Sequence, residues 1–159
     1  MKIGQSEIAI VALGGLEFEV SAREIVDIPK LPDDGGITIG VYGESEGERA
    51  QVLRFDCFRN GPHYHMPPSA PGQLEIDASE GDGLDWTFAR IRDELPAMIE
   101  RAGFGDLARR VDAAALRAGW ERVRDAAAAC AGMPLQFKDY DPAAMAQAAE
   151  AAGAGAARH

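Results

Sequence analysis

Two histidines, His63 and His65, stand two positions apart in a segment that also carries Arg54 and Asp56. A carboxylate beside an imidazole can fix the tautomer of the ring and raise its basicity, which both a metal ligand and a general base require. A neighbouring guanidinium can stabilise negative charge that develops during a reaction. Residues 54–65 are therefore the candidate functional site of this sequence.

The alternation of side chains along a strand assigns these residues to a face. A strand over residues 50–58 directs one set of side chains to the core and the other set away from it. The core set is Leu53, Phe55 and Cys57, and the opposite set is Val52, Arg54, Asp56 and Phe58. We expect Cys57 and Cys130 to be buried free thiols, because free cysteine behaves as a small apolar residue.

A hairpin would bring the histidines to the same face as the charged pair. A two-residue turn at Asn60-Gly61 places Asp56 opposite His65 and assembles all four candidate side chains into one patch. Pro62 argues for a wider loop, because it lacks the amide hydrogen that normally closes such a turn.

Three roles stay open for this patch. In a structural role, Asp56 pairs with Arg54 and the two histidines cap a sheet edge. In acid-base chemistry without a metal, His65 is the base, His63 is the acid and Arg54 stabilises negative charge. In a metal site, the histidines bind a divalent ion such as zinc.

The metal hypothesis needs a third protein ligand, because catalytic zinc usually takes three. Asp56 is the first candidate for that ligand, and Glu75 and Asp77 are remote alternatives. The spacing of these residues matches none of the common zinc signatures. The hypothesis of a metal site therefore depends only on the two histidines and the carboxylate.

The rest of the chain predicts a segregated α+β fold, in which C-terminal helices cover an antiparallel sheet of about five strands. The predicted strands span residues 6–13, 15–20, 37–42, 50–58 and 74–78. The predicted helices span residues 84–102, with a kink or a break at Pro96, then 106–131 and 142–152. We expect one domain over residues 1–152 and a flexible tail over 153–159.

Composition narrows the classes of function. The 159 residues carry a formal net charge of -10 and no basic run, which argues against a nucleic-acid partner. The first apolar run, residues 8–13, is too short for a signal peptide or a membrane span, so we expect a cytoplasmic protein. A small-molecule ligand and a homo-oligomer remain open, the latter through the alanine-rich last helix.

Several elements resemble a family of small bacterial proteins of unknown function. They are Arg54-Phe-Asp-Cys-Phe58, Pro62-His-Tyr-His65, Leu84-Asp-Trp86 and the helix through residues 94–103. The resemblance covers about residues 52–112 and implies domain boundaries without a mechanism. The strand followed by Pro-His-x-His is also similar to small bacterial toxin components of toxin-antitoxin pairs, although the acidic N-terminal half is unsuited to cleaving RNA.

The contrasting hypothesis is an interaction module without catalytic activity. In that case the acidic sheet face or the last helix, over residues 142–152, docks on another subunit, and the histidines are incidental.

Overall fold

The structure is a computed structural model that describes residues 1–141 and 143, except 78 and 80. Within these residues it is a mixed α+β fold with one antiparallel sheet and five helices. The strands are β1 (Lys2–Gln5), β2 (Ala9–Leu13), β3 (Leu16–Val26), β4 (Asp34–Ser45), β5 (Glu48–Phe58), β6 (His63–His65), β7 (Leu74–Glu75) and β8 (Gln136–Asp139). The helices are α1 (Gly83–Asp93), α2 (Leu95–Arg101), α3 (Gly105–Arg110), α4 (Ala113–Gly119) and α5 (Glu121–Cys130).

The sheet is larger than the sequence indicates. Its strands are ordered β7-β6-β5-β4-β3-β1-β8, and β2 pairs with β3 alongside β1. The described residues thus form eight strands, and the predicted number of about five is wrong. The missed strands β1, β6 and β8 have only three or four residues each, too few for a periodic pattern to be recognised. A tight turn at Gly14 and Gly15 joins β2 to β3, and both residues have positive φ angles.

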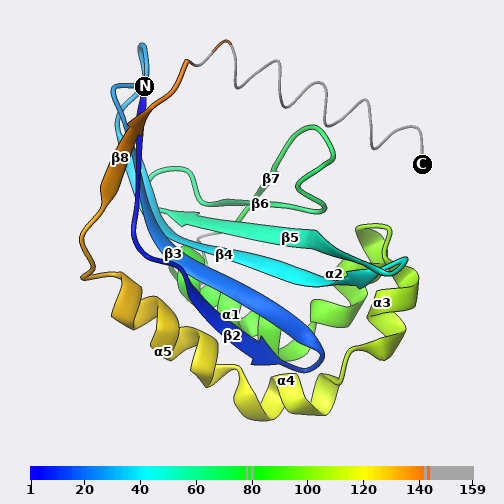
Figure 1. Cartoon of the computed structure of the whole chain (residues 1–159). Helices are drawn as coiled ribbons and strands as arrows, with labels where there is room; N and C mark the ends of the chain where they lie inside the picture. Colours follow the sequence, from blue (N-terminus) through cyan, green and yellow to red (C-terminus); the bar gives the residue numbers. More distant parts are fainter. Residues whose placement is uncertain (78, 80, 142, 144–159) are drawn as a thin grey trace.

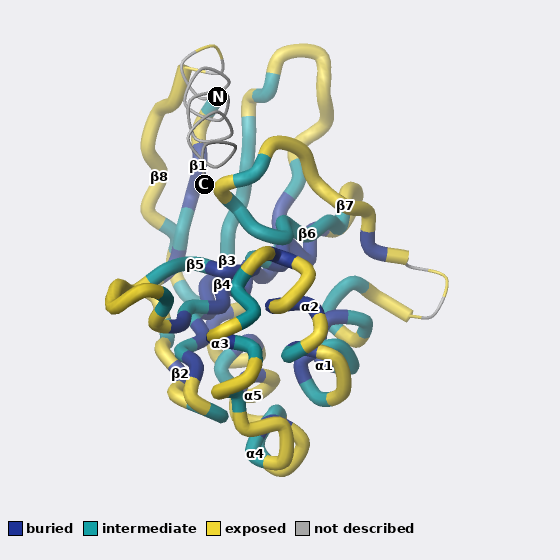
Figure 2. Tube along the Cα trace, turned by 90° about the vertical axis from the view of Figure 1, so that its right-hand side faces the viewer, coloured by how far each residue is buried: buried dark blue, intermediate teal, exposed yellow. Residues whose placement is uncertain are grey.

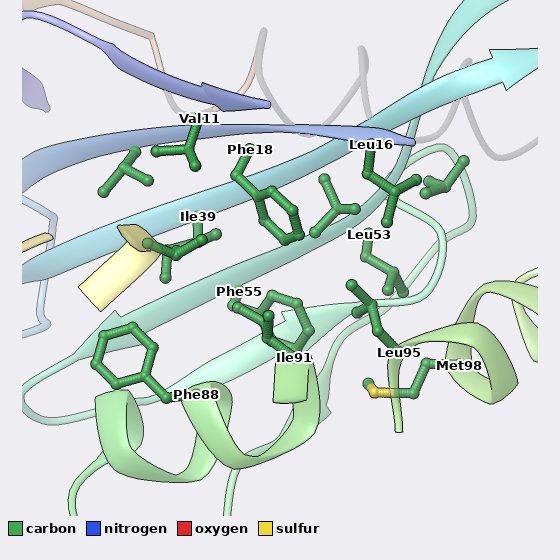
Figure 3. Close-up of a cluster of buried hydrophobic side chains, with 14 of the residues drawn as sticks. Val11, Leu16, Phe18, Ile39, Leu53, Phe55, Phe88, Ile91, Leu95 and Met98 are labelled. Atoms are coloured by element: carbon green, nitrogen blue, oxygen red, sulfur yellow. The ribbon is translucent and has the colours of Figure 1, made fainter. Parts of the chain in front are cut away.

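The five described helices lie on one side of the sheet (Figure 1). Apolar side chains fill the space between the two layers, and Figure 3 shows Phe88 and Ile91 of α1 facing Phe55 and Ile39 of the sheet. Figure 2 shows that the central strands are the most buried part of the trace. We call this side of the sheet the core face.

The helices are shorter than the periodicity predicts. The helix expected over 84–102 ends and restarts at Glu94, so α2 begins with Pro96 in its first turn, where a missing amide hydrogen is harmless. The segment expected as one helix over 106–131 forms three, and the Asp112 carboxylate caps α4 by accepting a hydrogen bond from the Ala115 amide, 3.0 Å away. Nearly all of the helix predicted over 142–152, and the predicted tail over 153–159, lie outside the described residues.

The opposite side of the sheet carries the candidate site. The sheet is strongly bent, and the segment between β6 and β7 rises on the side away from the helices (Figure 1). We call this side the polar face. None of the described helices combines the length and the apolar composition needed to cross a membrane.

Candidate functional site

Strand register places polar residues in rows across the polar face. One row of directly paired residues runs Glu19, Gly40, Arg54, His65 over β3, β4, β5 and β6. The next row runs Ser21, Thr38, Asp56, His63. Arg54, Asp56, His63 and His65 therefore lie on one face of the sheet, as predicted. The two rows also extend across β3 and β4, which were not part of the predicted patch.

The predicted pairing of the hairpin is wrong by two residues. Asp56 lies opposite His63, and Arg54 lies opposite His65. The connecting loop spans residues 59–62, four residues in place of the expected two. A shift of two residues preserves the face of every side chain, so the error left the predicted patch intact.

Asp34, at the start of β4, explains the wider loop. Its carboxylate accepts hydrogen bonds from the backbone amides of Asn60 at 3.0 Å and Gly61 at 2.9 Å. These amides therefore have partners that a two-residue turn would not provide. Pro62 needs no partner for its nitrogen, and its carbonyl accepts from the Ile76 amide at 3.1 Å.

The centre of the site is one carboxylate oxygen, Oδ2 of Asp56. His63 Nε2 lies 3.0 Å from it and His65 Nε2 lies 3.3 Å from it. Arg54 Nε lies 3.2 Å from the same oxygen. The other oxygen, Oδ1, accepts a hydrogen bond from the hydroxyl of Thr38 at 3.0 Å. All four candidate residues therefore meet at Asp56, and Thr38 fixes the rotation of its carboxylate.

Asp56 is buried but remains ionised. Its side chain is only 3% exposed. Burial alone would raise the pKa of this carboxyl, yet hydrogen bonds from His63 and His65 and the charge of Arg54 outweigh burial and hold the pKa well below its usual range. The Asp56 carboxylate is thus a buried negative charge at the centre of the cluster.

His63 is held between two hydrogen-bond acceptors. Its Nδ1 lies 2.7 Å from the Gly61 carbonyl oxygen, while its Nε2 faces Asp56. Burial opposes the charged ring, but the bonds to Asp56 and to the Gly61 carbonyl prevail, so the pKa of His63 is raised. The protonated ring donates Nδ1–H to the Gly61 carbonyl and Nε2–H to Asp56, and loss of the Nε2 proton leaves a lone pair that faces the carboxylate.

His65 has a different partner. Arg54 Nη2 lies 3.0 Å from its Nε2, and a guanidinium can only donate. The Nε2 atom of His65 accepts from Arg54 when the ring is neutral with its proton on Nδ1, and it donates to Asp56 Oδ2, 3.3 Å away, when Nε2 is protonated. The rings of His63 and His65 meet edge to face with centroids 5.1 Å apart.

The alternative metal ligands lie outside this cluster. Among the described residues, the group with ligand atoms close enough to share an ion is Asp56, His63 and His65, all within 4.8 Å of one another. Glu75 is the register partner of His63 but is exposed and does not join the group. The exposed Asp77 carboxylate accepts from the Ser79 amide at 2.9 Å.

The strand assignment holds with one correction. Leu53, Phe55 and Cys57 face the core as predicted. Val52 was assigned to the polar face, but it is fully buried in the core because β4 and β5 shift register at Val41 and Tyr42. Both cysteines are buried and unpaired, as expected.

The site is not at the sheet edge itself, because β7 pairs with the outer side of β6. Two contributors were missed in the sequence. Thr38 lies on a correctly predicted strand, and its alternation with Ile37 and Ile39 was the available signal. Arg23, which lines a cavity together with Thr38 and Arg54, lies on the extension of β3 beyond its predicted end at residue 20.

Residues 10–127 match a protein family described as a Domain of unknown function (DUF7700). The chain belongs to this family. The DUF7700 match contains all four candidate residues and is wider than the 52–112 resemblance, so the expectation of a family of unknown function is confirmed. No curated protein and no solved structure matches the chain.

Proposed function

We propose that this DUF7700 protein binds one divalent transition-metal ion, such as zinc, through His63 Nε2, His65 Nε2 and Asp56 Oδ2. The spacing of the ligand atoms carries the proposal. Ligands about 2.1 Å from a metal are separated by about 3.0 Å at right angles and about 3.4 Å at tetrahedral angles. The two distances from Asp56 Oδ2, 3.0 and 3.3 Å, fall at these values.

The surroundings of the ligands also suit a metal centre. Metal-binding histidines usually donate their other ring nitrogen to a carbonyl or carboxylate, and His63 Nδ1 lies 2.7 Å from the Gly61 carbonyl oxygen. Ligating carboxylates are similarly held by neighbours, and Thr38 does this for Asp56. Two imidazoles and one carboxylate would leave coordination positions open for water or a ligand, which is typical of catalytic sites.

Arg54 sets a condition on the proposal. Its guanidinium contacts both Asp56 Oδ2 and His65 Nε2, two of the three proposed ligand atoms. Metal binding therefore requires the Arg54 side chain, which is 30% exposed, to move away from His65. An Arg54 that stays in place would keep the cluster as a hydrogen-bonded network.

That contact favours one second candidate, acid-base chemistry without a metal. The roles are those expected from the sequence: His65 is the base, His63 is the acid and Arg54 stabilises negative charge. The 3.0 Å contact from Arg54 to His65 Nε2 supports it, because a ring that accepts from Arg54 carries a lone pair on Nε2, which is free to take a proton once Arg54 turns away. The expected cytoplasmic location and the homo-oligomer stay predictions under either candidate.

The test is calorimetric titration of zinc and manganese into tag-free protein that has been treated with a chelator and dialysed. We expect saturation at one ion per chain for the wild type and loss of binding in the His63→Ala, His65→Ala double variant. His159→Ala is the matched control, since His159 is the third histidine of the sequence, and it should bind as the wild type does.

Two results decide against the metal. A wild-type protein that binds neither ion refutes the proposal, and so does a double variant that is folded by circular dichroism and binds with unchanged affinity. If the double variant does not fold, His65→Gln alone takes its place and should weaken binding at least tenfold.

A further inference from the structure

A small cavity lies on the polar face beside the cluster. Its volume is about 210 Å³, and its lining includes seven side chains that can donate hydrogen bonds: Arg23, Arg54, Ser21, Thr38, Tyr42, Gln5 and Gln51. Ligand pockets usually enclose about 300 Å³ or more, so this one suits a compact molecule or a single functional group. Arg23 and Arg54 are guanidinium groups, which can only donate, so they favour an acceptor-rich ligand.

A glycine keeps the cavity open. Gly40 stands between Glu19 and Arg54 in its row and presents no side chain to the polar face. A Cβ atom at this position would lie 2.7 Å from Gln51 Nε2 and 3.0 Å from the Tyr42 ring. The space in front of the sheet therefore depends on Gly40.

Arg23 is the unusual member of the lining. Its Nε atom is buried and has no hydrogen-bond partner, and its guanidinium forms no ion pair within residues 1–77, 79, 81–141 and 143. Buried polar groups nearly always have partners, because an unsatisfied buried group loses its hydration without replacement, and the loss is greater for a charged group. Arg54, by comparison, is satisfied by Asp56 and His65.

The nearby carboxylates do not supply the missing partner. Asp56 already accepts from Thr38 and Arg54 and contacts both histidines. Glu19 also lines the cavity, but its carboxylate lies 3.4 Å from Arg49. Burial lowers the pKa of Arg23, Asp56 opposes this effect and Arg54 adds to it, yet a guanidinium stays protonated in proteins.

We propose that this cavity binds a compact oxyanion, the carboxylate or phosphate group of a small molecule, with Arg23 as its principal ligand. A guanidinium matches the geometry of either group through paired N–H donors. Thr38 already donates its hydroxyl hydrogen to Asp56, so the hydroxyl of Ser21 and the side chain of Arg54 supply the further donors around the oxyanion. The inference goes beyond the proposed metal site and does not require a metal.

The experiment measures binding of two probes, inorganic phosphate and malonate, to the full chain by calorimetry in the presence of a chelator. The pair of probes separates a phosphate preference from a carboxylate preference. We expect at least one probe to saturate at one molecule per chain, and Arg23→Gln to weaken that binding at least tenfold.

Three further variants make the result specific. Arg101→Gln removes the same charge from an exposed position on α2 and should leave the affinity unchanged. Gly40→Ala keeps every charge but narrows the cavity, so it should weaken binding. Arg23→Met removes the unpartnered charge, and we expect it to raise the unfolding midpoint of the ligand-free protein while abolishing the further rise that the bound probe gives the wild type.

Absence of saturable binding of both probes overturns the proposal. Equal affinity in the wild type and in folded Arg23→Gln also overturns it, because the anion would then bind elsewhere. Because a chelator is present throughout, failure here leaves the metal titration unaffected, and failure of the metal titration leaves this result unaffected.

Discussion

Phe55 and Asp56 are neighbours on β5 and are almost equally buried, at 0% and 2% exposure, but they belong to opposite faces of the sheet. Phe55 is buried among apolar side chains, including the stacked Tyr64 ring with its centroid 5.9 Å away. Asp56 is buried among hydrogen-bond donors. The comparison shows that burial on the core face follows from apolar area, whereas burial on the polar face depends on a specific set of partners.

The largest expected effect comes from the core face. Phe55→Ala should lower the free energy of unfolding by about 3–5 kcal/mol, because it removes a fully buried ring and leaves a cavity. Chemical denaturation measures the loss. Ile10→Ala, at an apolar position that is 59% exposed, is the control and should change stability by less than about 0.5 kcal/mol. Similar losses for both variants would contradict the assigned core.

On the polar face, Asp56→Asn should lower the free energy of unfolding by about 1–3 kcal/mol at neutral pH, because Arg54 and the histidines lose a charged acceptor. The folded pKa of Asp56 lies below its unfolded value, so its contribution is fully present above about pH 4 and is lost as the pH falls further. Denaturation with a chelator present, between about pH 2 and 7, should therefore show the two proteins converging in acid. A constant difference over this range would mean that ionisation of Asp56 does not stabilise the fold.

Arg54 separates a metal centre from a closed polar network. Arg54→Gln removes a positive charge that contacts two of the proposed ligand atoms, so zinc affinity should rise about tenfold, or about 1.4 kcal/mol. Arg49→Gln is the matched control, since Arg49 pairs with Glu17 and Glu19 away from the cluster. Zinc affinity that falls in Arg54→Gln would show that the guanidinium supports the bound state.

The smallest effect is expected at the two thiols. Cys57 faces the core, and burial raises its pKa to about 12, so almost none of it is thiolate at neutral pH. Neither Cys57 nor Cys130 should react with a thiol reagent in the native protein, and both should react in denaturant. Rapid labelling of one thiol under native conditions would place that cysteine outside the core.

The core face could be predicted from the sequence because its signal is local. Alternation along residues 53–57 identified Leu53, Phe55 and Cys57 correctly, and the helical stripe from Leu84 identified the covering helices approximately. Their breaks at Glu94, Asp112 and Trp120 depend on capping and packing, which periodicity does not report.

The polar face was predictable only in part because its partners come from distant segments. The pair His63 and His65 and the face of Asp56 followed from spacing, whereas the register followed from the hydrogen bonds of Asp34 with the loop amides. Thr38 and Arg23 join the site through pairing of β3, β4 and β5. No local pattern specifies those contacts.

The proposed metal site is the central claim, and crystals grown in the presence of zinc test it most directly, with diffraction data collected at the zinc absorption edge. The account predicts one anomalous peak about 2.0–2.2 Å from His63 Nε2, His65 Nε2 and Asp56 Oδ2, with the Arg54 guanidinium displaced from His65. The absence of an anomalous peak at these three atoms, with Arg54 still in contact with His65, would contradict the proposed metal site.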